Sequence, residues 1–550
     1  MTKLIECVPN FSEGVNLDII KQITDEVESV EGVRLLNVDP GKATNRTVVT
    51  FVGEPDAVIE AAYLAIKKAG ELIDMSKHKG EHPRMGATDV CPLIPIANIT
   101  MEETAAYAQK LAKRVGEELN IPVYLYEHAQ KDKKRSNLSV IRAGEYEGFF
   151  KKIKLPEWKP DFGPDEFDAK RGGTVIGARD FLIAYNVNLN TTSTRRANAV
   201  AFDVREAGRM IEDANGNKVN QPGSLKFVKA IGWFIEEYGV AQISINLTNI
   251  EVTPVHIAFD EVCKKAAERG MRATGSELVG LIPLKAMLDA GKYFLRKQNR
   301  SVGVSEKELI RIAIISMGLD ELAPFNPDER IIEYLLKDKS SSKLVSITLT
   351  DFADETASES PAPGGGSISA YVGSLGASLA AMVANLSSHK KGWDDRWKEF
   401  SNWAEKGQYY KDELLRLVDL DTAAFNKIME SFGLPKSTEE EKAARNTAIQ
   451  EATRYAIEVP FKVMQLAHDS LQVIKAMAET GNPNSITDAG VAALCARTAV
   501  LGAFMNVKIN ASGYKDKVYT ADILKQGEEI EKLTIALEKE VIDLVNSNIQ

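Results

Sequence analysis

Short apolar runs alternate with longer amphipathic stretches through the first 330 residues of the chain. A change of period between about 2 and about 3.6 residues predicts strands interleaved with helices. Strands are predicted at residues 4–9, 33–38, 47–52, 90–96 and 123–126, and helices at 56–75, at 101–119 and after Asn16 as a cap. The order β-α-β-β-α-β-α-β favours helices layered on one face of a mostly antiparallel sheet.

A second unit of similar pattern follows a connector at 161–173 that is punctuated by Gly and Pro. Its strands are predicted at 181–189, 228–234, 242–247 and 276–282, and its helices at 194–208, 253–269, 284–294 and 306–317. We therefore expect an α+β fold with two ferredoxin-like α/β subdomains, at residues 1–178 and 179–330. The two subdomains share a pattern and show no clear residue-level duplication.

The pattern changes after a Ser- and Lys-rich stretch at 337–343, which is typical of a linker. We place the linker at 331–346 and a third domain at 347–550. Strand patterns disappear there, and long helices are predicted at 367–388, 394–430, 438–480, 485–509 and 520–549, of which 394–430 is one helix or two. Helices of this number and length predict an all-α helical bundle.

Composition narrows the class of protein. The chain has 550 residues, of which 44% are hydrophobic and 27% charged, the balance of a soluble globular protein. The length alone suggests roughly three or four domains. A net charge of −10 and a pI of about 5.5 argue against a nucleic-acid or anionic-membrane surface, which needs clustered positive charge.

Cysteine usage and the N-terminus indicate a compartment. The four cysteines, Cys7, Cys91, Cys263 and Cys495, lie far apart without a CxxC pair, so we expect no disulfide framework and a reducing environment. The N-terminus has no signal-peptide apolar region, and no apolar stretch is expected to approach the roughly 20 residues of a membrane helix. We expect a cytoplasmic protein without membrane partners.

The stretch from Lys77 to Asp89 is the first candidate site. Gly80, Pro83 and Gly86 predict a loop between a helix and a strand, and the loop carries two of the six histidines. His82 is the sharpest candidate, because an imidazole both takes and gives a proton near neutral pH. The alternative is a surface loop with solvated charges.

A metal site at this loop is not favoured. His78 and His82 have no HExxH motif and no third ligand at metal-site spacing. We therefore expect no metal.

Asp39 falls at the end of a predicted strand, so that Asp39 and His82 would face one cleft.

The helical half holds two further features. A Gly-rich turn at 361–367 runs directly into a predicted helix, where free backbone N–H groups suit an anion, although a tight helix entry with Ser367 as cap explains the turn equally well. Asp421 lies on the apolar stripe of its helix, where an acid is costly to bury unless it is paired or functional, and its pKa would tend upward. Asp419 points elsewhere and is expected to be solvated.

Several motifs of the first half resemble the glutamate formimidoyltransferase family. The resemblance rests on Cys7–Gly14, Asp39, Thr44–Thr47, Gly80–Gly86, Arg142–Glu147, Asp161–Pro164, Gly177–Arg179, Asn186–Leu189, Gly232–Trp233, Gln242–Asn246 and Ser276–Pro283. Together they cover about the first 330 residues in order. The stretch Asp213–Gly223 resembles an added hairpin loop.

This resemblance implies transfer of a formimino group between glutamate and tetrahydrofolate, in mono- or polyglutamylated form, as co-substrate. By resemblance His82 is the base that deprotonates the folate amine and the acid that protonates the departing glutamate nitrogen. We expect Asp39 to orient His82. Arg84 would bind substrate carboxylates, with Lys77 and Lys79 more simply explained as a solvated face. Folate binding is implied around Gly163, Pro164 and Gly172.

The second half resembles the formimidoyltetrahydrofolate cyclodeaminase family. The matching residues are Ala362–Ser367, Ser374–Gly376, Asp419–Asp421 with Ala424–Phe425, Gly481–Asn482, Ser485, Asp488–Ala489, Gly502–Ala503 and Asn506–Val507, and the segment 387–405 departs from the pattern. The resemblance implies closure of 5-formimino-tetrahydrofolate to 5,10-methenyl-tetrahydrofolate with release of ammonia. Asp421 would move protons at the departing nitrogen, and Gly365, Gly366 and Ser367 would bind substrate.

A transferase followed by a cyclodeaminase is the arrangement of bifunctional enzymes of histidine degradation. Resemblance to them implies small-molecule substrates and homo-oligomers in which the helical domains pair. Two alternatives stay open. In one, the helical half only assembles or scaffolds the transferase; in the other, the whole chain binds folate without catalysis.

Overall fold

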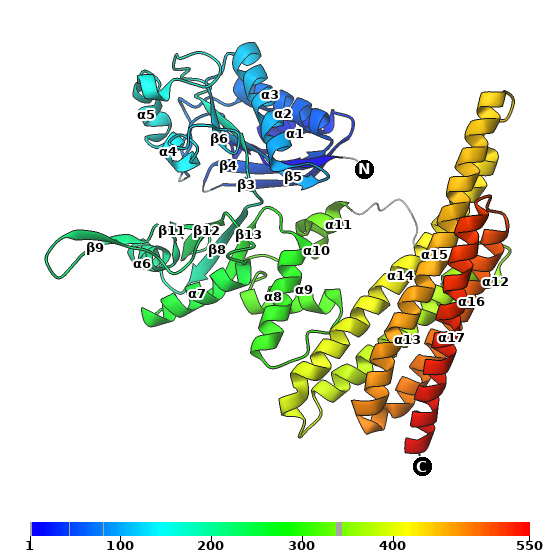
Figure 1. Cartoon of the computed structure of the whole chain (residues 1–550). Coiled ribbons are helices and arrows are strands. Elements are labelled where there is room, and N and C mark those ends of the chain that lie inside the picture. Colours follow the sequence, from blue (N-terminus) through cyan, green and yellow to red (C-terminus); the bar gives the residue numbers. More distant parts are fainter. Residues whose placement is uncertain (1–2, 43, 81, 337–343, 550) are drawn as a thin grey trace. The chain divides into compact units, whose positions relative to one another are not determined.

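The computed structural model describes residues 3–42, 44–80, 82–336 and 344–549. The chain forms two compact units, of which the first comprises Met1–Ala290 with Ala313–Lys337 and the second Gly291–Ile312 with Asp338–Gln550 (Figure 1). The first unit has mixed sheets with helices and the second is nearly all helical, so the predicted α+β fold followed by a helical domain is confirmed.

The first sheet has seven strands, and helices cover one of its faces. Its strands are β1 Leu4–Cys7, β2 Asn10–Phe11, β3 Val33–Gly41, β4 Arg46–Gly53, β5 Thr88–Ala97, β6 Val123–Glu127 and β7 Thr174–Ala178. The covering helices are α1 Leu17–Glu28, α2 Pro55–Leu72 and α3 Met101–Leu119. As predicted, Asn16 caps α1 by accepting from the N–H groups of Asp18 and Ile19.

Strand β7 was not predicted, nor were two short helices, α4 Leu138–Arg142 and α5 Glu145–Lys152. β7 lies between β5 and β6 and is parallel to both, while the remaining pairs are antiparallel. Its five residues follow Gly172 and Gly173, and so short a run next to glycines gives little periodic signal.

The second sheet has the order β11-β12-β8-β13, entirely antiparallel. Its strands are β8 Ile183–Leu189, β11 Val228–Ile235, β12 Val240–Leu247 and β13 Ala273–Val279, with helices α6 Thr194–Val204 and α7 Val255–Glu268. This is the βαββαβ order of a ferredoxin-like unit. The added loop is a hairpin of β9 Arg209–Glu212 and β10 Lys218–Gln221.

The two sheets lie between the two layers of helices in Figure 1, with α1–α3 outside the first and α7 outside the second. A direct contact joins them, since the Gly280 N–H after β13 donates to Asp39 Oδ2 at 2.9 Å. In β3 and β4, Asp39 pairs with Val48 and Gly41 with Arg46, so Asp39 and Arg46 share the sheet face that α1–α3 do not cover.

Helices α8 Leu284–Lys297 and α9 Glu306–Met317 follow the second sheet, and the loop between them packs into the helical unit. There the Val302 N–H donates to Ser401 Oγ at 3.0 Å. After α10 Pro327–Arg330, helix α11 Ile332–Leu336 is tied back to the sheet by the Ile332 N–H, which donates to Ile282 O at 3.1 Å. The predicted linker at 331–346 thus contains folded residues up to 336, and its centre, 337–343, is outside the described residues.

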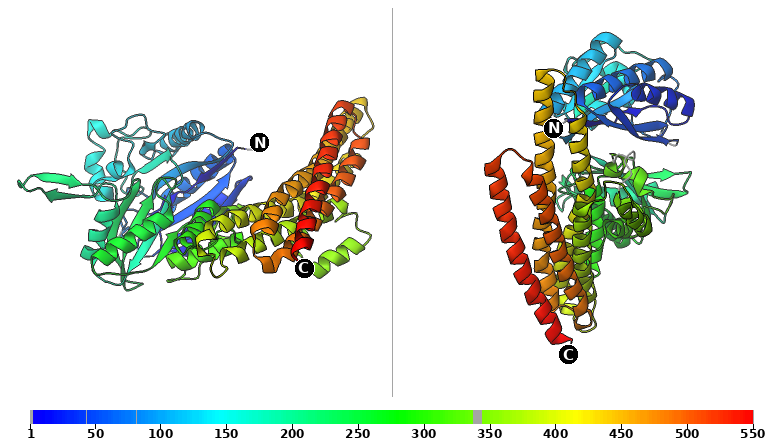
Figure 2. Two further views of the ribbon diagram at one scale, coloured as in Figure 1. Left: turned by 60° about the horizontal axis from the view of Figure 1, so that its bottom comes forward. Right: turned by 90° about the vertical axis from the view of Figure 1, so that its right-hand side faces the viewer.

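The helical unit consists of α12 Leu349–Ala357, α13 Gly365–Ser388, α14 Trp397–Gly433, α15 Glu439–Thr480, α16 Ile486–Ser512 and α17 Lys517–Asn548 (Figure 2). All five predicted long helices are present, and the segment with two possible interpretations is the single helix α14. Small side chains line α13 and α16 where these helices enter the core, such as Ala377, Ala384, Ala492 and Ala499.

The expectation that no apolar stretch is long enough for a membrane was wrong. Helix α13 and the segment Pro483–Ser512 are both long and apolar enough to cross a membrane by length and composition, with a hydropathy of 1.5 in each. In the folded unit, 61% and 50% of these stretches are buried, as is ordinary for core helices of a bundle.

Candidate active sites

The loop that carries His82 is clamped by the strand-connecting segment before β7. The Ala87 N–H donates to Arg171 O at 2.8 Å, and Gly86 and Gly172 form an isolated antiparallel bridge. Gly172 has φ +68°, and a Cβ there would overlap the Met85 carbonyl oxygen. Gly172 therefore has a backbone reason to be glycine, and it braces the His82 loop.

Gly163 has a similar role on the far side of the same segment. Its φ is +83°, and a Cβ would overlap the Ile121 carbonyl and approach Gly116 in α3. Pro164, which follows, is half-buried. The predicted folate contacts of Gly163, Pro164 and Gly172 stay predictions, because backbone packing already explains both glycines.

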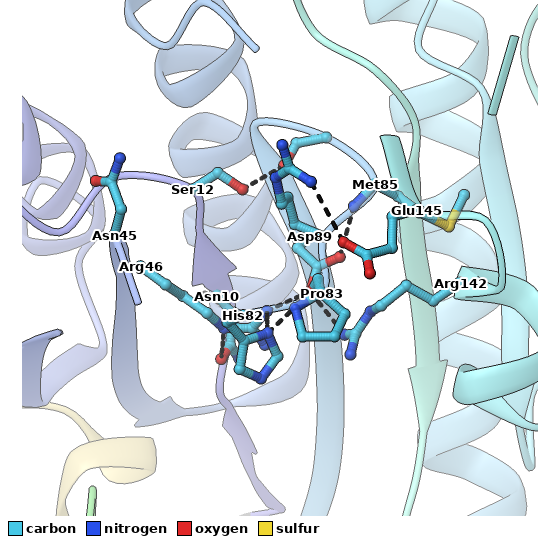
Figure 3. Close-up of polar contacts among 12 residues, drawn as sticks. Asn10, Ser12, Asn45, Arg46, His82, Pro83, Met85, Asp89, Arg142 and Glu145 are labelled. Carbon is cyan, nitrogen blue, oxygen red and sulfur yellow. Dashed lines mark hydrogen bonds and ion pairs between the residues drawn. The ribbon is translucent and has the colours of Figure 1, made fainter. Parts of the chain in front are cut away.

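His82 is half-buried and fixed through one ring nitrogen (Figure 3). Nδ1 lies 2.8 Å from the Pro83 carbonyl oxygen and 3.1 Å from Arg46 Nη1. A carbonyl oxygen only accepts, so the tautomer that makes the first bond carries its proton on Nδ1 and keeps the lone pair on Nε2. Burial and the charges of Arg46 and Arg142 lower the pKa of His82 to about 3, so the imidazole is neutral at neutral pH.

Beside His82 lies a buried carboxylate with two arginines. Asp89 Oδ2 accepts from Arg46 Nη1 at 2.5 Å and from Arg142 Nη2 at 2.6 Å, and Oδ1 accepts from the Met85 N–H at 3.0 Å. Burial opposes ionisation of Asp89, but Arg142 and Arg46 outweigh it and hold the pKa of this carboxyl below its ordinary value. None of these three residues was predicted as a site residue.

Asp39 has partners other than His82. Besides the Gly280 N–H, its Oδ2 lies 3.7 Å from Arg330 Nη1. In the described part of the chain no recorded contact joins Asp39 to His82, and the carboxylate whose charge acts on the His82 pKa is Asp89. Asp39 thus holds the two subdomains together, and its predicted role in orienting His82 has no contact to support it.

Arg84 forms ion pairs with two glutamates of the same chain. It is buried, and its Nη2 lies 2.6 Å from Glu147 Oε1 and its Nη1 3.3 Å from Glu145 Oε2. Its Nε donates to His78 Nδ1 at 3.3 Å. A substrate carboxylate at Arg84 would have to compete with Glu147, so this predicted binding role stays a prediction.

The second sheet carries a polar network that was not predicted as a site. Gln242 is 1% exposed and its Nε2 donates to Asn188 Oδ1 at 2.9 Å and to Glu277 Oε2 at 3.3 Å. Asn186 Nδ2 and the Tyr238 hydroxyl also donate to Glu277, each at 3.1 Å. The motifs around Asn186 and Gln242 therefore fix one acceptor-rich face of the sheet.

In the helical unit, the two predicted features form one site. Ser367 is fully buried, and its Oγ donates to Asp421 Oδ2 at 3.0 Å. A Cβ on Gly366 would overlap the Asp421 carboxylate, and a Cβ on Gly365 would lie 3.4 Å from Asn506 Nδ2. Gly366 is therefore required because a carboxylate from α14 lies against the first turn of α13.

Asp421 caps the N-terminus of α13 although it belongs to another helix, α14. The N-cap residue, Gly364, has no side chain, and the Ser367 N–H donates to Asp421 instead. Burial raises the pKa of Asp421 above its ordinary value, while the hydroxyl and N–H of Ser367 act in the opposite direction. A carboxyl poised in this way exchanges protons more readily near neutral pH than an ordinary aspartate does.

Within residues 3–42, 44–80, 82–336 and 344–549, no group of three or more His, Cys, Asp and Glu side chains is placed to hold a metal ion.

Three family descriptions match consecutive parts of the chain. They are the N-terminal subdomain of the formiminotransferase domain at residues 4–179, the formiminotransferase domain at 184–337, and formiminotransferase-cyclodeaminase at 348–529.

Relatives match over the whole chain and over each half. A formimidoyltransferase-cyclodeaminase of Gallus gallus is 44% identical over 98% of this chain and 99% of its own length. A glutamate formimidoyltransferase of Thermoplasma acidophilum is 44% identical over 53% of this chain and 92% of its own length. A methenyltetrahydrofolate cyclohydrolase of Methylorubrum extorquens is 36% identical over 37% of this chain and 97% of its own length. The chain belongs to the formimidoyltransferase-cyclodeaminase family.

Proposed function

We propose that this chain is a bifunctional folate enzyme of histidine degradation. It transfers the formimino group of N-formimino-L-glutamate to tetrahydrofolate, and then closes 5-formimino-tetrahydrofolate to 5,10-methenyl-tetrahydrofolate with release of ammonia. The observation that carries this proposal is 44% identity to a bifunctional relative over 99% of that relative's length. The polar clusters at His82 and Asp421 add a separate proton-transfer group to each half.

The first reaction needs a base and then an acid at one place. N5 of tetrahydrofolate attacks the formimino carbon, and the C–N bond to glutamate breaks after the glutamate nitrogen gains a proton. His82 Nε2 takes the proton from N5 and returns it to the glutamate nitrogen, so the imidazole ends as it began. In the tautomer that donates to the Pro83 carbonyl, Nδ1 carries the proton and the lone pair of Nε2 is available for this task.

The second reaction releases ammonia. N10 attacks the formimino carbon and gives up its proton as the five-membered ring closes. The bond from that carbon to its terminal nitrogen then breaks, and this nitrogen, which has gained the N10 proton and one more, leaves as ammonia. The raised pKa of Asp421 keeps a larger fraction of this carboxyl protonated than in an ordinary aspartate, and the protonated form is the acid that the leaving nitrogen needs.

Product analysis on the full-length chain tests both steps. With N-formimino-L-glutamate and tetrahydrofolate, we expect glutamate, 5,10-methenyl-tetrahydrofolate and ammonia in equal amounts. Glutamate without ammonia would leave a transferase with a scaffolding helical half. Ammonia-free conversion of added 5,10-methenyl-tetrahydrofolate to the formyl derivative would assign the helical half the reaction named for the Methylorubrum extorquens relative. Absence of all products would leave folate binding without catalysis.

We also propose a cytoplasmic homo-oligomer with paired helical domains. The four cysteines are free, and Cys7 Sγ and Cys91 Sγ lie 3.5 Å apart without a bond, which suits a reducing compartment. Helices α13 and α16 expose large apolar side chains, which suits association between copies: Leu375, Met382, Leu386, Val491, Leu494, Met505 and Ile509. Tetrahydrofolate, in mono- or polyglutamylated form, is the co-substrate in this proposal.

A further inference from the structure

The cluster beside His82 holds more positive than negative charge. Arg46 and Arg142 both pair with the same oxygen of Asp89, whose other oxygen accepts from a backbone N–H. Within the described residues, which leave out Glu81, no second acid is paired with either arginine. One carboxylate thus faces two guanidinium groups, which leaves an excess charge of one next to the imidazole.

This excess charge is largely withdrawn from water. The side chains of Arg46 and Arg142 are 11% and 13% exposed, and Asp89 is fully buried. Arg142 Nε is buried and has no hydrogen-bond partner among the described residues. A buried guanidinium donor without an acceptor is costly, and it is a place where a ligand acceptor gains most.

Arg84, which lies two residues after His82, shows the opposite arrangement. It pairs with two acids, Glu145 and Glu147, and has no charge to spare for a ligand. Figure 3 shows that Arg46 and Arg142 approach Asp89 from opposite sides, with the His82 ring next to them. The spare positive charge beside His82 is therefore at Arg46 and Arg142 and not at Arg84.

We propose that Arg46 and Arg142 form the subsite that binds the α-carboxylate of the formimino donor. This inference rests on the proposed transferase function and identifies the α-carboxylate as the group of the donor that the site recognises. Guanidinium groups bind carboxylates through paired, charge-assisted hydrogen bonds. Because Arg46 Nη1 lies 3.1 Å from His82 Nδ1, an anion bound here lies next to the reacting imidazole.

The chemistry of the substrates identifies the donor as the source of this carboxylate. In N-formimino-L-glutamate, the α-carboxylate is attached to the carbon that carries the reacting nitrogen. In tetrahydrofolate, the glutamyl carboxylates are separated from N5 by the whole aminobenzoyl group. Only the donor carboxylate is therefore forced to lie near the transfer site.

Binding of this carboxylate has a consequence for catalysis. The negative charge offsets the field of Arg46 and Arg142 at the imidazole and makes His82 a better proton acceptor in the complex than in the free enzyme. Arg46 and Arg142 are in this way specificity-determining residues that also prepare the base.

The test compares two formimino donors on the full-length chain. Formamidine carries the reacting group without a carboxylate. We expect Arg142→Gln to lower the preference for N-formimino-L-glutamate over formamidine, measured as the ratio of kcat/KM values, by roughly 10- to 100-fold, with Arg142→Lys in between. Arg135→Gln, which removes a partly buried arginine paired with Asp161, is the matched control and should leave the ratio unchanged. An unchanged ratio in Arg142→Gln would overturn the subsite.

Two further measurements distinguish a donor-carboxylate subsite from a site for the folate tail and from a general loss of structure. With tetrahydropteroate, which lacks the glutamyl tail, as acceptor, the effect of Arg142→Gln should persist; its disappearance would assign the arginines to the folate tail and overturn the proposal. Calorimetric binding of N-formimino-L-glutamate should be lost in Arg142→Gln and kept in Arg135→Gln. Ammonia release from added 5-formimino-tetrahydrofolate should be intact in both variants and reports that the helical unit is folded, while formimino transfer from formamidine reports that the mutated transferase unit is folded. Absence of any formimino transfer by the wild type, with donor binding retained, would contradict the proposed function and not the subsite.

Discussion

The proton affinity of His82 is set by three charged neighbours and by its burial. Arg46 and Arg142 act against the imidazolium and Asp89 acts for it, and the two arginines prevail together with desolvation. A free imidazole with so low a pKa is a weak base, because base strength in proton transfer follows the pKa. For His82 to act as the base, bound substrate must therefore change this balance of charges.

The titration of His82 in the free enzyme tests this balance. An ordinary histidine gains its proton near pH 6.5, whereas His82 has a pKa of about 3, so its ring stays neutral as the pH falls from 8 to 5. In an NMR titration of the histidine Cε1 resonances, the signal missing in His82→Gln should not shift over this range. In Arg142→Gln the same signal should titrate at a higher pH, since one opposing charge is gone. A midpoint near 6.5 in the wild type would contradict the environment described here.

Asp421 makes a second prediction, about stability. Its folded-state pKa is raised, so the ionised form is the one that folding disfavours. Stability from this group is complete below the ordinary pKa of 3.8 and is lost as the pH rises through the folded value. Asp421→Asn keeps an acceptor for Ser367 without the charge, and we expect it to raise Tm by about 2–5 °C at pH 8. The gain should vanish near pH 3.5.

The control for this prediction is Asp419, which lies two residues before Asp421 in the same helix. Asp419 accepts from the Leu344 N–H at 2.8 Å, whereas the Ser367 hydroxyl contacts Val418, Asp421 and Thr422 among the described residues. Asp419→Asn should not show a gain in Tm that grows with pH. Equal pH dependence in both variants would mean that burial of Asp421 does not govern its ionisation.

At the scale of elements, the regular parts of the fold followed from periodicity and caps. Helix α3 was predicted at its observed bounds, and the Asn16 cap was predicted correctly. Long amphipathic segments repeat their signal over several turns, which is why α13 to α17 were also recognisable. Strand β7 and the short helices α4 and α5 have too few residues for any period to show.

The site residues were predictable only in part, because some of them come together only in the folded structure. His82 and Asp421 stood out because each is a titratable residue in an unusual local context. Arg46, Asp89 and Arg142 come from β4, β5 and α4, and their meeting depends on strand pairing that no local pattern encodes. Asp39 was paired with His82 by position at a strand end, whereas its contact is with Gly280, 241 residues away.

Gly172 tests how the connecting segment supports the His82 loop. Replacement by Ala forces a side chain into φ +68° and against the Met85 carbonyl. We expect a loss of roughly 1–3 kcal/mol in the unfolding free energy of the transferase unit and a parallel fall in formimino transfer. Gly148→Ala in α5, where a Cβ would meet nothing within 4 Å, is the control and should leave both unchanged or improve stability slightly. Wild-type stability in Gly172→Ala would show that the clamp is not tight.

At the scale of the whole molecule, the exposed apolar side chains of α13 and α16 predict association. Met505 and Ile509 on α16 are 67% and 69% exposed, and Leu386 on α13 is 48% exposed. Light scattering after size exclusion should give a particle of several 60.4 kDa chains. Charged replacements on this surface, such as Leu386→Asp with Ile509→Asp, should reduce the mass, because a buried unpaired charge opposes the contact. A wild-type mass of one chain would contradict the paired arrangement.

The central claim is that one chain carries two independent proton-transfer sites, with His82 serving the first reaction and Asp421 the second. The most direct measurement assays both half-reactions separately on the full-length wild type, His82→Gln and Asp421→Asn. We predict that His82→Gln lowers formimino transfer by roughly 10²- to 10⁴-fold and leaves ammonia release from added 5-formimino-tetrahydrofolate intact, and that Asp421→Asn does the reverse. Loss of both activities in either folded variant, or of neither, would contradict the account.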